Sequence, residues 1–115
     1  MTQDQRHINT NEKDYLADWL DNSERRLVVL AFTAAWVGSF FLYRGYLEDL
    51  KEQYGGQIGL QIIDIEKHGA IARQLGVSQV PATILLRNHE VVEVLKGTTS
   101  RHKLVASVTP YLPKV

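Results

Sequence analysis

Cysteine is absent from this 115-residue sequence. Its absence excludes disulfide bonds, thiolate metal ligands, cysteine nucleophiles and CxxC redox chemistry by residues of this chain. An excess of charge of one sign is absent too, because 13 Lys and Arg residues balance 13 Asp and Glu residues. No net field draws the chain toward nucleic acid or an anionic membrane, so we expect neither as a partner.

Long hydrophobic runs and a leader-like N-terminus are also lacking. The apolar run at residues 27–32 is far shorter than the roughly 18–20 residues needed to span a bilayer. Residues 1–6 are polar and contain no positive segment leading into an apolar one. The length suits one domain of the usual size of about 100–200 residues. We therefore expect a cytoplasmic protein with a polar tail at residues 1–6 and one domain over residues 7–115.

The order of apolar segments predicts alternating strands and helices. The unbroken run Leu27–Phe32 is typical of a strand covered on both faces, as in a parallel sheet. Only residues 87–90 separate the last two strands, which predicts a β-hairpin whose tip places His89 at positive φ. Strands are expected at residues 7–9 (a short edge strand), 27–32, 60–65, 82–86 and 91–95. Helices are expected after Asn11, over residues 37–54 with Gly55-Gly56 at the end, over 69–75, and after Ser100 as far as Pro110.

Three strings stand at definite places in this order. Ala34–Phe40 reads AAWVGSF at the junction of an inner strand and the long helix, Asp64–Glu66 ends the next strand, and Leu75–Ala82 reads LGVSQVPA before the hairpin. These strings resemble the A-x-W-C-G-P-C, V-D-x-D and Y-G-I-x-x-I-P-T segments of the thioredoxin family. The resemblance spans residues 7–112. It implies an α/β thioredoxin fold, with a central mixed sheet of four to five strands flanked by helices on both faces, and a cis peptide bond before Pro81.

The residues at the resembling positions lack the family's redox chemistry. Val37 and Phe40 stand where the two catalytic cysteines would be, and neither can form the mixed disulfide that exchange requires. By the same resemblance, Ala31 replaces a buried aspartate that serves as a proton shuttle, and Ile62 replaces its lysine partner. We therefore expect no enzymatic activity and no cofactor.

The degenerate motif Trp36-Val37-Gly38-Ser39-Phe40 is the candidate functional site. The resemblance implies that Trp36 is exposed for partner binding, although it could instead pack against the start of the helix. Phe40 is interpreted as core filling rather than as a contact surface. Phe41 replaces a solvated polar position and is harder to explain as core. The candidate partner-binding residues are Trp36, Val37, Phe41, Val80 and Pro81.

Catalytic and metal-binding alternatives have little support in the sequence. Ser39 is interpreted as a helix-start hydroxyl, because no histidine has a clear claim to pair with it as a nucleophile. The histidines show neither H-x-x-x-H nor carboxylate spacing, so we expect no metal site. They occupy positions 7, 68, 89 and 102.

These observations lead to three functional hypotheses. The first is a redox-inactive binding protein, chaperone-like or an adaptor, that uses the old active-site face for a protein or peptide partner. The second is a non-catalytic accessory of a thiol-disulfide pathway whose thiols come from a partner. The third is an architectural homodimer that buries the degenerate face on itself.

Overall fold

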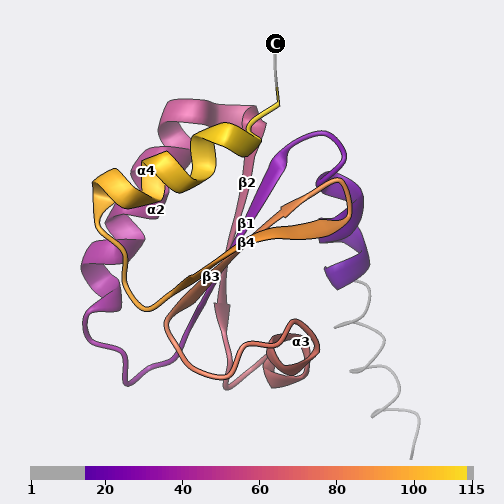
Figure 1. Ribbon diagram of the computed structural model, residues 1–115. Coiled ribbons are helices and arrows are strands. Elements are labelled where there is room, and N and C mark those ends of the chain that lie inside the picture. The colour runs from indigo at the N-terminus through magenta and orange to yellow at the C-terminus, as the bar shows by residue number, and fades with distance from the viewer. Residues whose placement is uncertain (1–14, 114–115) are drawn as a thin grey trace, which may run out of the picture.

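Four strands form one mixed sheet in the order β2-β1-β3-β4 (Figure 1). The computed structural model describes residues 15–113. Strand β1 pairs parallel with β2 and antiparallel with β3, and β3 and β4 form the predicted hairpin. The edge strand expected at residues 7–9 lies outside the described residues. The strands are β1 (Leu27–Thr33), β2 (Ile58–Asp64), β3 (Ala82–Arg87) and β4 (Glu90–Lys96).

Helices cover both faces of this sheet, as the sequence predicts (Figure 1). Residues 15–22 are helical in the described part of the chain. Helices α2 and α4 pack on one face, and α3 and the helix at residues 15–22 pack on the other. Within residues 15–113, no helix has the length and apolar character required to cross a membrane. The remaining helices are α2 (Phe40–Tyr54), η1 (Gly55–Gln57), α3 (Gly69–Gln74), α4 (Arg101–Val108) and η2 (Thr109–Tyr111).

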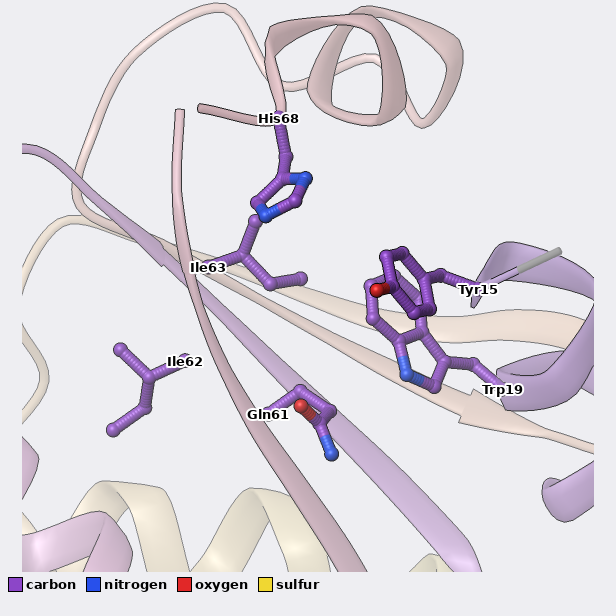
Figure 2. Close-up of a pocket in the computed structure, with 6 residues that line it drawn as sticks. All are labelled: Tyr15, Trp19, Gln61, Ile62, Ile63 and His68. Carbon is purple, nitrogen blue, oxygen red and sulfur yellow. The ribbon is translucent and has the colours of Figure 1, made fainter. Parts of the chain in front are cut away.

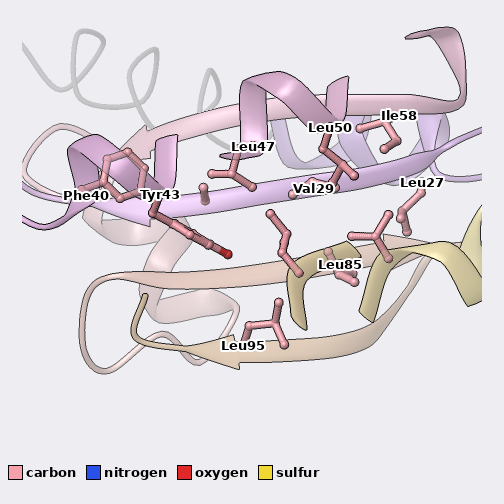
Figure 3. Close-up of a cluster of buried hydrophobic side chains, with 12 residues drawn as sticks. Leu27, Val29, Phe40, Tyr43, Leu47, Leu50, Ile58, Leu85 and Leu95 are labelled. Carbon is pink, nitrogen blue, oxygen red and sulfur yellow. The ribbon is translucent and has the colours of Figure 1, made fainter. Parts of the chain in front are cut away.

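Strand β1 supplies the centre of the core, because its two faces belong to two separate apolar clusters. Leu27, Val29 and Ala31 pack with α2 and α4, whereas Val28, Leu30 and Phe32 pack with α3. Figure 3 shows side chains of α2 lying against β1 and β3 in the first cluster. Burial on both faces explains why the β1 sequence is apolar at successive positions rather than at alternate ones.

Helix α2 and strand β2 begin at other residues than the sequence predicts. The helix starts at Phe40, not Val37, because residues 34–39 form two successive turns closed by bonds from Val37 N to Ala34 O and from Phe40 N to Val37 O. Strand β2 starts at Ile58 rather than Leu60. Ile58 is buried opposite Leu27, but the following glycine interrupts the apolar run that marked the strand.

Gly55 ends helix α2 and Ser100 caps the start of helix α4, as the sequence predicts. Gly55 adopts φ +53° at the end of α2, and Ser100 Oγ accepts a hydrogen bond from Lys103 N at the start of α4. At the hairpin tip, Asn88 and His89 have φ values of +54° and +67°.

The hairpin tip is fastened to the segment before β1 through Ser23, which is fully buried. The Ser23 hydroxyl donates to Leu20 O and accepts from His89 N, while Ser23 O accepts from Asn88 N and from the Arg87 guanidinium. One serine thus joins the end of the first helix to the β3–β4 turn.

Candidate functional site

The degenerate motif lies on the loop between β1 and α2. Trp36 is 67% exposed and Val37 is half-buried, while Gly38 and Ser39 are exposed. Ser39 occupies the N-cap position of α2 but makes no side-chain capping bond. The loop therefore presents an indole and a valine side chain to solvent, with no nucleophile–base pair.

The two adjacent phenylalanines differ sharply in burial. Phe40 is 7% exposed and packs in the core with its ring edge-on to Tyr43, whereas Phe41 is 80% exposed. Phe40 thus fills the interior at a position where the resemblance to the thioredoxin family implies a cysteine. Phe41 remains available for contact.

Trp36 shares a cleft of about 320 Å³ with the loop that precedes β3. The Val80–Pro81 peptide bond is cis, and Pro81 O accepts a hydrogen bond from Gly97 N. Among residues 15–113, the backbone N–H and C=O of Val80 have no hydrogen-bond partner. This cleft therefore combines an exposed indole with backbone groups able to pair with an extended chain. Its other lining residues are Ile65, Ala72, Val77, Ser78 and Gln79.

Val37 and Phe41 line a different cleft, of about 360 Å³, at the carboxyl ends of β1 and β2. Arg44 and Asp64 are its charged members, and small side chains make up much of the remaining lining. The structure thus divides the five candidate residues. Trp36 and Val80 line one cleft and Val37 and Phe41 line the other, whereas Pro81 lines neither. Sequence reasoning did not identify the residues from Val77 to Gln79 that complete the first cleft, although their position just before Pro81 was a usable signal.

Among residues 15–113, no acidic side chain is buried in the core. Ala31 is fully buried and lies between Ile62 on β2 and Thr83 on β3 in the sheet register. Next to Ala31 lie two buried hydroxyl groups, Tyr43 Oη and Thr83 Oγ1, which are 2.6 Å apart. Burial raises the pKa of Tyr43, and hydrogen bonds with Thr83 and Thr99 lower it in part. Burial therefore favours the neutral form of the Tyr43 hydroxyl.

Two other features could hold a ligand in principle. Asp21, Glu24 and His89 bring three exposed potential metal-ligand atoms within 4.8 Å of one another, and His89 Nε2 already contacts Glu24. Between β2 and the helix at residues 15–22, a cavity of about 350 Å³ is lined by aromatic, polar and aliphatic side chains, namely Tyr15, Trp19, Gln61, Ile62, Ile63 and His68 (Figure 2). Tyr15 and Trp19 stack there with ring centroids 6.3 Å apart. Neither feature involves the degenerate motif.

The strand order, the loop at the end of β1 and the cis-proline loop beside it define a thioredoxin-fold domain without a thiol. The chain belongs to the thioredoxin family, whose model, described as "Thioredoxin", matches residues 6–110.

Named relatives agree with this assignment. "Thioredoxin" of Bacillus subtilis (strain 168) is 31% identical over 86 residues, which cover 74% of this chain and 83% of that protein. "Thioredoxin 2" of Plasmodium falciparum (isolate 3D7) is 28% identical over 91 residues, covering 79% of this chain but only 58% of that protein. The structure of Fasciola hepatica thioredoxin has a TM-score of 0.75 at 20% identity, covering 84% of this chain and 90% of that one, and shows likeness of fold. The chain is similar to redox thioredoxins but lacks cysteine.

Proposed function

We propose that this protein is a redox-inactive thioredoxin-fold binding protein, acting as a chaperone-like factor or an adaptor, that holds an extended apolar peptide segment in the Trp36 cleft. The observation that carries the proposal is the position of Trp36. Its side chain is 67% exposed beside a cleft whose opposite wall is the Val77–Val80 segment. An exposed tryptophan in a concave site is the type of residue that anchors protein interfaces.

The backbone of Val80 supports an extended peptide as the occupant. Its N–H and C=O are unpaired among the described residues, and a peptide strand could satisfy both groups while its side chains contact Trp36. Catalysis receives no such support, because the chain has no thiol and Ser39 has no basic partner within hydrogen-bonding distance among the described residues.

A peptide array tests this proposal. Immobilised peptides of about a dozen residues, with and without cysteine, are probed with the wild type, with Trp36→Ala and with Val91→Ala. Val91 is a matched control because it is 46% exposed on β4 and is not among the residues that line the cleft. We expect the wild type and Val91→Ala to bind the same apolar peptides, and Trp36→Ala to bind them at least about 30-fold more weakly, the loss typical of an interface anchor.

The array also separates the alternatives. Equal binding by Trp36→Ala and the wild type, or no binding above background, would contradict the proposal. Binding restricted to peptides with paired cysteines would instead favour the accessory role in a thiol-disulfide pathway.

A further inference from the structure

We propose that the outward face of helix α2 is a self-association surface, on which two copies of this chain pack antiparallel about a two-fold axis close to Gly45. This surface is distinct from the Trp36 cleft, so it goes beyond the proposed function and leaves that cleft open. The outward α2 face is defined here by Phe41, Leu42, Arg44, Gly45, Tyr46, Glu48 and Asp49, which line a shallow groove of about 480 Å³.

Two large apolar side chains on this face point into solvent. Phe41 is 80% exposed and Leu42 is 66% exposed, on the first turn of a helix whose opposite face is buried in the core. No other pair of adjacent residues in the described part of the chain exposes two large hydrophobic side chains. Apolar patches of this kind mark interaction surfaces more often than scattered single residues do.

Gly45 lies at the centre of the outward face. The buried residues of α2 follow helical spacing, and about 100° of rotation per residue places Gly45 opposite their mean direction. A Cβ built on Gly45 would meet no atom within 4 Å, so packing inside the chain does not require glycine there. Glycine inside a helix costs about 1 kcal/mol relative to alanine. Because no side chain stands at its centre, this face leaves room for the side chains of a second helix.

Charge on this face is self-complementary, which identifies a second copy as the occupant. Arg44 lies before Gly45, and Glu48 and Asp49 lie one turn after it. A two-fold axis near Gly45 reverses the second helix, so that Arg44 of each copy lies beside Glu48 of the other. The same operation stacks the Leu42 edge of one helix on the Tyr46 edge of the other. Arg44 Nε and Glu48 Oε2 already pair within one helix at 3.2 Å. Both side chains are more than half exposed, so each can also contact the oppositely charged side chain of a second copy.

The size of this face predicts a weak dimer. Interfaces that bury less than about 1,200 Å² of accessible surface, counted over both partners, are typically transient. We expect two copies that meet through one helix face each to fall below this area. We therefore expect reversible association that depends on protein concentration. Sedimentation equilibrium should show a rising average mass from about 5 to about 500 μM, the micromolar range in which such interfaces dissociate.

Because the chain has no cysteine, a single introduced thiol reports the position of the axis. Two cysteines form a disulfide only when their Cα atoms come within about 7 Å. Under mild oxidation with copper phenanthroline, we expect Gly45→Cys to form a covalent dimer at least about tenfold faster than Val91→Cys, an outlying control at 46% exposure. Ala35→Cys, on the exposed degenerate loop, should react at the control rate.

Charge reversal provides a second measurement. Arg44→Glu should abolish association, and Arg44→Glu combined with Glu48→Arg should restore it, with circular dichroism showing an unchanged fold. A monomeric wild type at every concentration, or equal cross-linking of Gly45→Cys and Val91→Cys, would overturn the proposal. Fast cross-linking of Ala35→Cys alone would also overturn it and would place the dimer on the degenerate face. None of these outcomes tests peptide binding by Trp36, so the two proposals can fail separately.

Discussion

The hydroxyl of Tyr43 lies 2.6 Å from the Oγ1 atom of Thr83, inside the core and next to the buried methyl group of Ala31. Ala31 stands where the resemblance to the thioredoxin family places an aspartate. A neutral hydroxyl pair can be buried with its hydrogen bonds satisfied, whereas an isolated carboxylate at this depth would be costly. The interior beneath the degenerate loop therefore suits a protein that has no thiol to deprotonate.

Tyr43→Phe should lower the free energy of unfolding by about 1–2 kcal/mol, because it removes the hydroxyl that bonds Thr83 and leaves the buried Thr83 Oγ1 without this partner. Tyr54→Phe is the matched control, since the half-buried Tyr54 hydroxyl makes no hydrogen bond with the described residues. Urea unfolding, monitored by circular dichroism, measures the free energy of unfolding of both variants. Equal effects of the two substitutions would contradict the role assigned to the Tyr43 hydroxyl.

Stability should fall at alkaline pH through Tyr43. Burial raises the pKa of Tyr43 in the folded state above its unfolded value of 10.0. The folded state thus holds this proton more tightly, so the stabilisation is complete below pH 10 and is lost as the pH rises through the folded pKa. Unfolding from about pH 9 to about pH 11 should show a smaller loss of stability for Tyr43→Phe than for the wild type. If the wild type and Tyr43→Phe lost the same stability over this pH range, Tyr43 would not be the group responsible.

Ser23→Ala should destabilise the protein by about 0.5–1.5 kcal/mol, since it removes a fully buried hydroxyl that accepts a hydrogen bond from His89 N and donates one to Leu20 O. Ser78→Ala, at an exposed position, should change little. Hydrogen exchange gives the specific signature: the His89 amide should lose protection while amides of α4 keep theirs. Uniform loss across the molecule would point to general destabilisation instead.

The wild type should show no disulfide reductase activity above a dithiothreitol blank in an insulin turbidity assay, because it has no thiol. Val37→Cys combined with Phe40→Cys should be weakly active. It should also be less stable by about 3 kcal/mol, since Phe40 is a buried ring in the core.

Adding Ala31→Asp to that double variant should raise its reductase rate by restoring a proton acceptor beneath the loop. Full activity from the two cysteines alone would show that no such acceptor is needed.

Much of the fold could be predicted from local signals. The double-sided burial of β1 appears as an unbroken apolar run, the positive φ of His89 follows from the short hairpin, and Ser100 caps α4 as its residue type suggests. The exposure of Phe41 and the burial of Phe40 also follow from their positions relative to the resembling motif.

What the sequence did not predict depends on contacts between distant segments. Ser23 and His89 are 66 residues apart, and nothing local to either residue indicates their bond. Ile58 joins β2 because it packs opposite Leu27, despite the glycine that follows it. The separation of Trp36 from Val37 into two clefts depends on where the Val77–Val80 loop lies in space.

The strand order also has a consequence for synthesis of the chain. Strand β1 lies at the centre of the sheet, but β3, which covers one of its edges, is made some 50 residues after it. Until Ala82–Arg87 has left the ribosome, the most apolar strand of the protein has an open edge able to pair with another chain. Folding must therefore wait for the second half of the chain, and a nascent chain stalled before β3 would be prone to aggregate.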